Sequence, residues 1–427
     1  MTEQDRVLAK CAWRLVPFMT LLYVVNYIDR VNVGFAALTM NKELGFSPSI
    51  YGFGAGIFFF SYALCQVPAS MMIARIGPRR GIFWILLIWG ALSAANAFVW
   101  NPTSFYVVRF FLGIAEAGFF PGMVFYLTLW FPKDYLGRSI AGFQATNPLA
   151  FVIGGPLSGL LLGMDGTLSL SGWQWLFLAE GLPACILAFA VYRWMPDGPA
   201  DASWLDGDEQ AAIASCHHSD AVPEHGDIRV ALKDWRVFAI GLVGIGLIFC
   251  ITGLQLWVPQ IVQGMGFSNE MVGMVVAVPF VCATAAMILW GYASDLRKER
   301  IWHITWAALS TALGLIIASI STSHLLVLLG LTIAIVGQFS ALPVINTLLP
   351  SVLRGPALAG GVALYNTMAQ FGGFFGPIVI GVLKQQTESY AAGLIALAVA
   401  VTSSAAITLA LGRALSPRMV PESIARA

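Results

Sequence analysis

Residues 14–38 of the chain read RLVPFMTLLYVVNYIDRVNVGFAAL, an apolar run that is interrupted by an adjacent acid and base, Asp29 and Arg30. A helix needs roughly 20 predominantly apolar residues to cross the hydrocarbon core of a bilayer, and this run is long enough. It does not alternate with the period of two that a membrane β-strand requires. The run therefore predicts a transmembrane helix, and similar runs recur along the whole chain.

The composition supports the same interpretation. Of 427 residues, 58% are hydrophobic and 11% are charged, whereas about 25% are charged in soluble domains. This excludes a soluble globular protein, a disordered chain and a nucleic-acid binder, which would need a basic surface. We predict an all-α membrane protein with twelve transmembrane helices, near residues 14–38, 51–74, 82–100, 103–129, 139–163, 173–194, 236–263, 270–293, 301–320, 325–349, 357–384 and 390–412.

Lysine and arginine are distributed unevenly between the two sets of loops. All but four of the 23 basic residues lie in one set of loops or near the termini. Lys42 and Lys384 lie on the opposite side, and Arg30 and Arg109 lie inside predicted helices. Cytoplasmic loops carry the excess of Lys and Arg. We therefore expect both termini and the long loop at 195–235 to be cytoplasmic.

The polar segment 195–235 divides the chain into an N-terminal six-helix unit at 1–194 and a C-terminal one at 236–427. Two features recur with one common spacing. The Gly-Pro pair at 155–156 recurs at 376–377, and a basic turn recurs in which Arg79 corresponds to Arg300. This shared repeat spacing predicts a duplicated unit and hence two pseudo-symmetric bundles. Transporters built this way bind substrate between their repeats.

Four ionisable residues lie well inside predicted helices: Asp29 and Arg30 in the first, and Arg109 and Glu116 in the fourth. A charge near the bilayer centre costs on the order of 3 kcal/mol or more, so such residues are usually functional. Counting about 1.5 Å per residue, we expect all four to converge on one polar cavity in the N-terminal unit. The alternative is a charge cluster that only holds two helices together. Glu180, in the sixth helix, is interpreted as structural.

The C-terminal unit has no counterpart of these charges. A shift by the repeat spacing carries them onto Cys250, Ile251, Gly330 and Gly337. That unit offers neutral amides instead, and the hypothesis is a division of labour in which it binds substrate hydroxyls or rings while the N-terminal unit handles charge and protons. Any one of these amides more often forms an interhelical hydrogen bond. The amides are Gln255, Gln260, Gln338, Asn346 and Asn366; Asn147 of the N-terminal unit is a further candidate for substrate binding.

A buried arginine is a fixed cation that suits a carboxylate or phosphate, which it binds through two hydrogen bonds. Two buried carboxyls, Asp29 and Glu116, can exchange protons as an anion enters or leaves. Together these groups predict proton-coupled symport of an organic anion. The chain has no HExxH, GxSxG or Walker A motif, so we expect no enzyme, no ATP-driven pump, no cofactor and no metal site. A proton-driven exporter of organic acids or drugs, and a membrane sensor without transport, are the alternatives.

The chain resembles the major facilitator superfamily, and within it the anion:cation symporter family of carboxylate permeases, over essentially its whole length. The most specific pieces are NYIDR at 26–30 and RFFLGIAEAG at 109–118. GGPLSG at 154–159 and GWQWLF at 172–177 are also similar. The superfamily's loop signature is kept as GYASD after the eighth helix, but after the second helix Ala74 replaces the usual acid.

The resemblance implies uptake of a small organic anion with protons across the bacterial inner membrane. In sugar-acid members the acids of the first and fourth helices are proton sites, which corresponds to Asp29 and Glu116 here, with Arg109 as a charge partner. The first-helix arginine, Arg30, meets the substrate carboxylate. Tyr27 and Tyr62 match tyrosines beside the substrate, and Asn366 matches a polar residue of the eleventh helix.

Expected partners are therefore a small organic anion, protons and the lipid bilayer, with the protein a monomer. Related vesicular glutamate transporters carry an arginine in the seventh helix. Here that helix has none beyond its edge at Arg236, which favours a substrate with one engaged carboxylate. Family members carry sugar acids, tartrate, phthalate or other aromatic acids, and the choice among them stays open.

Overall fold

The computed structural model describes residues 3–218, 228–353 and 356–415. Its N-terminal half comprises α1 (Glu3–Glu43), α2 (Pro48–Ile76), α3 (Pro78–Ala95), η1 (Asn96–Phe98), α4 (Pro102–Glu116), α5 (Phe119–Thr128), α6 (Lys133–Leu162), η2 (Thr167–Ser169) and α7 (Gly172–Trp194). The connecting segment contains η3 (Pro199–Asp201), α8 (Gly207–His218) and α9 (Ile228–Lys233). The C-terminal half comprises α10 (Trp235–Gln263), α11 (Asn269–Arg297), α12 (Ile301–Ile320), α13 (His324–Ile345), α14 (Leu349–Val352), α15 (Pro356–Thr387) and α16 (Ala391–Leu415).

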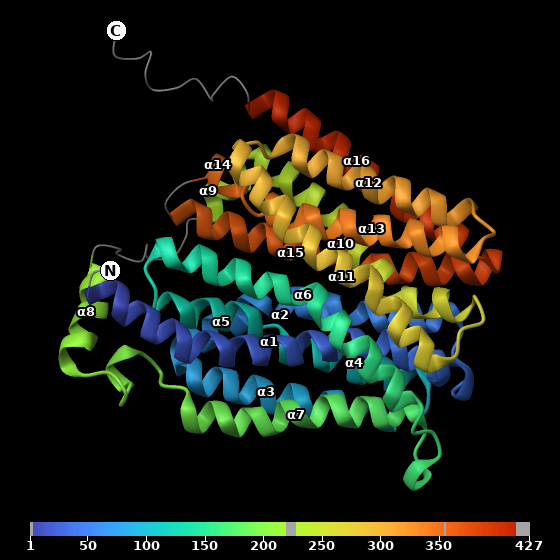
Figure 1. Ribbon diagram of the computed structural model, residues 1–427, viewed down its shortest axis with the longest axis horizontal. Coiled ribbons are helices and arrows are strands. Elements are labelled where there is room, and N and C mark those ends of the chain that lie inside the picture. The colour runs from blue at the N-terminus through green and yellow to red at the C-terminus, as the bar shows by residue number, and fades with distance from the viewer. Residues whose placement is uncertain (1–2, 219–227, 354–355, 416–427) are drawn as a thin grey trace.

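The two halves lie one above the other in Figure 1, with α8 and α9 at the same end as the start of α1. Eleven described segments are long and apolar enough to cross a bilayer, and α6 adds a twelfth whose described apolar part is Thr146–Leu162. The prediction of an all-α membrane protein with twelve spans is therefore confirmed.

The two halves repeat each other in detail. Ser47 caps the start of α2 by accepting a hydrogen bond from Ile50 N, and Ser268, one repeat spacing later, caps α11 in the same way. Gly52 and Gly273 are separated by the same interval. A Cβ atom at Gly52 would lie 2.6 Å from Pro377 O of α15, and one at Gly273 would lie 2.2 Å from a carbonyl oxygen of α6. Both glycines therefore let helices of opposite halves approach through their backbones.

The fourth crossing of each half is broken, a feature that the predicted continuous runs do not contain. α4 ends at Glu116 and α5 starts at Phe119, while α13 ends at Ile345 and α14 starts at Leu349. Each break starts four residues before a proline, Pro121 or Pro350. Because proline has no N–H to donate to the carbonyl four residues earlier, the helical ladder is interrupted there. The breaks place Glu116 and Asn346 at helix ends in the middle of the molecule.

The halves pack closely at the end at which α1 and α10 finish. Val31 to Leu38 of α1 and Cys250 to Leu254 of α10 are buried on every side. There, Tyr51 Oη donates a 2.8 Å hydrogen bond to Leu256 O across the two halves. Gln263 Nε2 also donates to Leu38 O there, at 3.3 Å. We call this the closed end, and the opposite end, where α1 starts, the open end.

The connecting segment folds against the open end of the N-terminal half. Lys10 Nζ of α1 donates to both carboxylate oxygens of Glu209 in α8, at 2.8 and 2.6 Å. The Trp204 ring stacks on Trp130, with ring centroids 5.5 Å apart, and lies 5.2 Å from the Arg14 guanidinium carbon. The predicted linker therefore contains ordered contacts.

Candidate functional site

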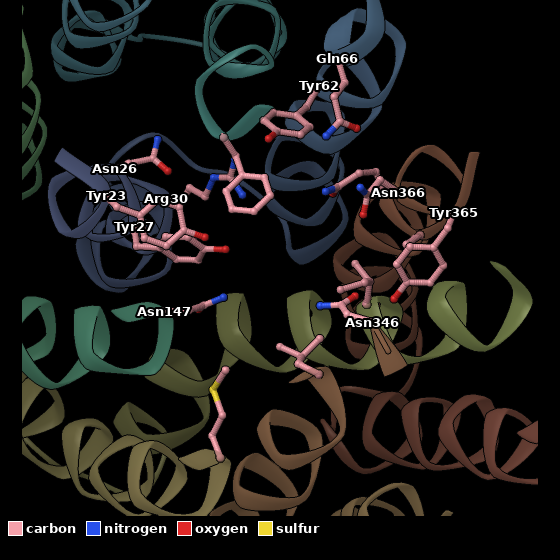
Figure 2. A pocket seen from close by; sticks show the side chains of 16 residues that line it. Tyr23, Asn26, Tyr27, Arg30, Tyr62, Gln66, Asn147, Asn346, Tyr365 and Asn366 are labelled. Atoms are coloured by element: carbon pink, nitrogen blue, oxygen red, sulfur yellow. The ribbon is translucent and has the colours of Figure 1, made fainter. Parts of the chain in front are cut away.

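A polar cavity of about 140 Å³ lies between the halves and contacts residues of α1, α2, α5 and α6 on one side and of α10, α11, α13 and α15 on the other (Figure 2). Its polar wall consists of Tyr23, Asn26, Tyr27, Arg30, Tyr62, Gln66, Asn147, Asn346, Tyr365, Asn366 and Gln370. A smaller cavity of about 80 Å³ shares Tyr27, Arg30 and Asn147 with it and adds Gln255. We call the two together the central cavity. All seven predicted substrate-binding residues line it.

Arg30 is the only charged side chain on this wall among the residues that the structure describes. Its Nε donates a short hydrogen bond to Glu116 Oε1 and forms an ion pair with it. The guanidinium carbon lies 4.8 Å from the ring centroid of Tyr62 and 5.4 Å from that of Tyr27. The Arg30 side chain is 15% exposed, so its charge reaches the cavity from between two aromatic faces.

Glu116 stands behind Arg30, away from the cavity. Its side chain is 1% exposed, and Oε1 accepts a second hydrogen bond, of 2.8 Å, from Asn26 Nδ2. The other oxygen, Oε2, has no hydrogen-bond partner among the described residues. The carboxylate is therefore held on one oxygen by Arg30 and is free on the other, which is an arrangement that can accept a proton.

Asp29 does not face the central cavity, contrary to the expectation that the four charges converge on it. Trp89 Nε1 donates to Oδ2 at 2.6 Å, Asn32 Nδ2 donates to Oδ1 at 3.0 Å, and Ser93 Oγ forms a short hydrogen bond to Oδ1. Successive residues of a helix are about 100° apart. When Arg30 points to the cavity, Asp29 consequently points to α3.

Arg109 is also outside the wall of the central cavity. It is 2% exposed, and its guanidinium carbon lies 4.8 Å from the ring centroid of Phe58. None of the described acidic side chains lies within ion-pair distance of it, and its Nε has no hydrogen-bond partner there. The four charges therefore do not all reach the central cavity. Arg30 lies on its wall, Glu116 lies directly behind Arg30, and Asp29 and Arg109 are buried deeper.

The C-terminal half contributes neutral polar groups to the central cavity. Asn346 and Asn366 line the larger cavity, and Gln255 lines the smaller one. In Figure 2 the two asparagines lie across the cavity from Arg30. The other two candidate amides lie elsewhere: Gln260 accepts from Asn41 at the closed end, at 3.4 Å, and Gln338 accepts from Cys250.

Several lining residues were not identified from the sequence. Tyr23 and Asn26 precede Tyr27 and Arg30 by one helical turn, so the i, i+3 and i+4 spacing on the face of Arg30 contains the signal. Gln370 follows Asn366 by four residues, so the same periodicity identifies it. Tyr365 directly precedes Asn366, and adjacent residues of a helix do not share a face, so this rule does not identify Tyr365.

Two repeated helical halves that surround a polar cavity, with a break in the fourth crossing of each, define a membrane transport protein. The family comparison agrees with this class. The model of the Major Facilitator Superfamily matches residues 19–377 and 263–425. The chain belongs to the major facilitator superfamily.

Individual relatives are similar over nearly their whole length. The chain is 43% identical over 413 residues to a putative tartrate transporter of Agrobacterium vitis, with 96% of this chain and 95% of that protein covered. It is 36% identical over 397 residues to a quinolone resistance transporter of Acinetobacter baumannii, with 92% and 91% covered.

A solved structure has the same fold at low sequence identity. It is a bacterial homologue of the human lysosomal transporter Spinster, in an inward-facing and occupied conformation. The two chains align with a TM-score of 0.78 at 17% identity, with 96% of this chain and 98% of that chain covered.

Proposed function

We propose that the protein is a secondary transporter that takes up a small organic carboxylate together with protons by alternating access. The observation that carries the proposal is the guanidinium of Arg30, which lies on the cavity wall with its counter-charge, Glu116, buried behind it. A single cation among amides and phenols attracts an anion and orients it through paired hydrogen bonds. A neutral solute gains no such interaction.

Proton coupling follows from competition for Arg30. In the structure the guanidinium is paired with Glu116, so an incoming carboxylate must share or displace that partner. When Arg30 turns to the substrate, Glu116 becomes a buried charge without a cation, which is costly unless a proton binds it. Its free oxygen, Oε2, is the proton acceptor in this proposal. Through this pair, one anion and one proton enter together, and the charge of the Arg30–Glu116 site is unchanged.

Asp29 and Arg109 take part as buried charge partners in this proposal. Three donors hold the carboxylate of Asp29, and Arg109 is close enough to both Asp29 and Glu116 to interact with them electrostatically. When Glu116 gains or loses its proton, Arg109 is the buried cation that still balances Asp29. The role of Arg109 is therefore to keep the network near neutrality during the exchange.

The substrate class follows from the rest of the wall. Amide and phenol side chains line the larger cavity, and they match a compact solute that carries hydroxyls or a planar group beside its carboxylate. A cavity of about 140 Å³ suits a hydroxy acid of a few carbons. The putative tartrate transporter of Agrobacterium vitis supports the same class.

We further propose that the protein is a monomer of the bacterial inner membrane with both termini in the cytoplasm. The concentration of Lys and Arg in the loops on the side of the termini supports this orientation. The open end of the structure is then the cytoplasmic end.

Flux into proteoliposomes tests the proposal. Vesicles with a neutral interior and an acidic exterior are expected to accumulate tartrate or a sugar acid, and to lose that accumulation when an ionophore collapses the proton gradient. Glu116→Gln is expected to abolish gradient-driven accumulation while substrate exchange persists. Asp208→Asn, which removes an exposed acid of α8 outside the cavity, is the matched control and should transport normally. Full accumulation by both Glu116→Gln and Asp29→Asn would refute the proton route.

A proton-driven exporter is the second candidate, and one finding favours it: the 36% identity to a quinolone resistance transporter. An exporter would exchange protons for its solute, so the same inward proton gradient would empty preloaded vesicles. Fluoroquinolone efflux without carboxylate uptake would support this function over the first.

A further inference from the structure

Glu180, in the middle of α7, is a third buried acid that the proposed coupling does not use. It is 4% exposed, and its Oε1 accepts a 3.1 Å hydrogen bond from Ser158 Oγ of α6. Oε2 is buried without a partner, and no described cation lies within ion-pair distance. An unpaired carboxylate at this depth is costly, whereas a carboxylic acid is not.

The neighbouring residue Asn32 connects this acid to Asp29. Its Nδ2 donates to Asp29 Oδ1, and its side chain also interacts with Glu180. Asn32 Oδ1 and Glu180 Oε2 are both buried acceptors without a donor among the described residues. A proton on Glu180 Oε2 would turn one of these two acceptors into a donor.

The two acids on either side of Asn32 are held differently. Asp29 accepts three hydrogen bonds, from Asn32, Trp89 and Ser93, and these stabilise its ionised form. Among the described residues, Glu180 accepts one hydrogen bond from a hydroxyl, that of Ser158, and its side chain also interacts with Asn32. Of the pair, Asp29 is therefore the carboxylate and Glu180 the acid.

Glu180 is linked through Ser158 to the surface on which the halves move. Ser158 lies on α6 between Gly155 and Gly159. A Cβ atom at Gly155 would lie 2.6 Å from Gly273 O of α11, and one at Gly159 would lie 3.0 Å from Glu270 O. This backbone contact lies at the closed end. Any conformation in which the closed end opens must separate it and admit water toward Ser158.

Building on the proposed proton coupling, we propose that Glu180 is a second proton-binding residue of the transport cycle, loaded through the contact between α6 and α11. Water that enters when this contact opens gives a proton to the Glu180 carboxylate. Closure seals the resulting acid, whose side chain is buried in the structure. The proton then passes to Asp29 and, by way of Glu116 behind Arg30, to water in the central cavity.

Few charged groups surround Glu180. Whether its carboxyl group is protonated therefore depends mainly on whether the contact between α6 and α11 excludes water. From α1, Glu180 meets Asp29 and Asn32, with Glu43 farther along at the closed end, where Glu43 accepts from Ser171 and Trp173 of α7. The described neighbours on α3 and α6 are neutral at this level. Arg79 of α3 bonds to the opposite end of α7, at Tyr192 O.

Infrared spectroscopy of the full-length protein in lipid vesicles tests the protonation directly. The wild type is expected to show the carbonyl stretch of a buried carboxylic acid at neutral pH, and Glu180→Gln should lose that band. Gly155→Leu inserts a side chain into the α6–α11 contact, so its band should titrate with the external pH. Leu160→Trp adds bulk to the exposed face of α6 and should behave like the wild type. A band that survives Glu180→Gln, or that resists pH in Gly155→Leu, overturns the proposal.

Flux measurements give the second readout. Balancing a substrate gradient against a pH gradient should yield two protons per anion for the wild type and one for Glu180→Gln. Glu43→Gln removes an exposed acid between the same two helices and should retain two. An unchanged ratio in Glu180→Gln overturns the proposal. Wild-type uptake without any proton movement would instead refute the proposed function, and the infrared result would still decide whether Glu180 binds a proton.

Discussion

Replacing Glu116 by Gln should tighten anion binding, although it abolishes proton-driven accumulation. In the structure the Arg30 guanidinium is occupied by the Glu116 carboxylate, and a substrate carboxylate must compete with it. A hydrogen bond to a charged group contributes about 1.5–3 kcal/mol. A difference of about 1.4 kcal/mol corresponds to a factor of ten in affinity. Removing the competitor should therefore lower Kd by about ten- to a hundredfold at a pH at which Glu116 is ionised.

The affinity should also lose its pH dependence, because the glutamine imitates the protonated acid at every pH. Isothermal titration calorimetry of purified protein across a pH series measures both effects, with a carboxylate that flux assays identify as substrate. Wild-type Kd should approach that of Glu116→Gln as the pH falls, and Asp208→Asn should follow the wild type. Weaker binding by Glu116→Gln, or a retained pH dependence, would show that Glu116 does not compete for Arg30.

Three further outcomes follow from particular contacts. Trp89→Phe removes a donor from the buried carboxylate of Asp29 and should destabilise the protein by about 1–3 kcal/mol, seen as a lower Tm in a thermal scan. Gly52→Leu adds a side chain whose Cβ would lie 2.6 Å from a carbonyl oxygen of α15; it should separate the closed end, so that a cysteine-reactive probe labels a reporter cysteine placed there. The hydrogen bond from Lys10 lowers the pKa of the Glu209 carboxyl below its usual value, so docking of α8 is fully stabilised above about pH 4.3 and is lost as the pH falls through the lower folded-state pKa. Hydrogen exchange in α8 should rise at acidic pH in the wild type and be insensitive there in Lys10→Ala.

The spans could be predicted because hydrocarbon leaves the backbone few choices. In lipid every N–H and C=O must be paired within the segment, so an apolar run of sufficient length is a helix whatever its neighbours are. The repeat was visible for a similar reason: the glycines and prolines that shape it, such as Gly155 and Gly376, are recognisable one by one. The breaks at Pro121 and Pro350 carry a sequence signal too. Other helices here contain proline without ending, however, so the signal is not specific.

The direction in which each buried charged side chain points could not be predicted in the same way. Asp29 and Arg30 are neighbours in the sequence, and depth alone placed both beside one cavity. Which of them faces it depends on the rotation of α1, which is set by contacts from α3, chiefly Trp89 and Ser93. Arg109 likewise packs on Phe58 of α2. Such long-range contacts leave no periodic trace in a single sequence.

In the described part of the chain, the buried charged side chains lie in the N-terminal half, and this affects the free energy needed to open the closed end. Among the described residues, every ion pair lies within one half or joins α1 to α8, so none joins the two halves.

The closed end is held instead by neutral hydrogen bonds, including Asn41 to Gln260, Gln263 to Leu38 O and Tyr51 to Leu256 O. Each contributes about 0.5–1.5 kcal/mol, because water replaces it on opening. The hydrogen bonds that must break when the closed end opens therefore contribute a few kcal/mol in total. A substrate and its protons can supply a difference of that size by binding one conformation better than the other. Were the charges divided between the halves, each opening would instead strand a buried ion, and binding would have to offset a far larger penalty.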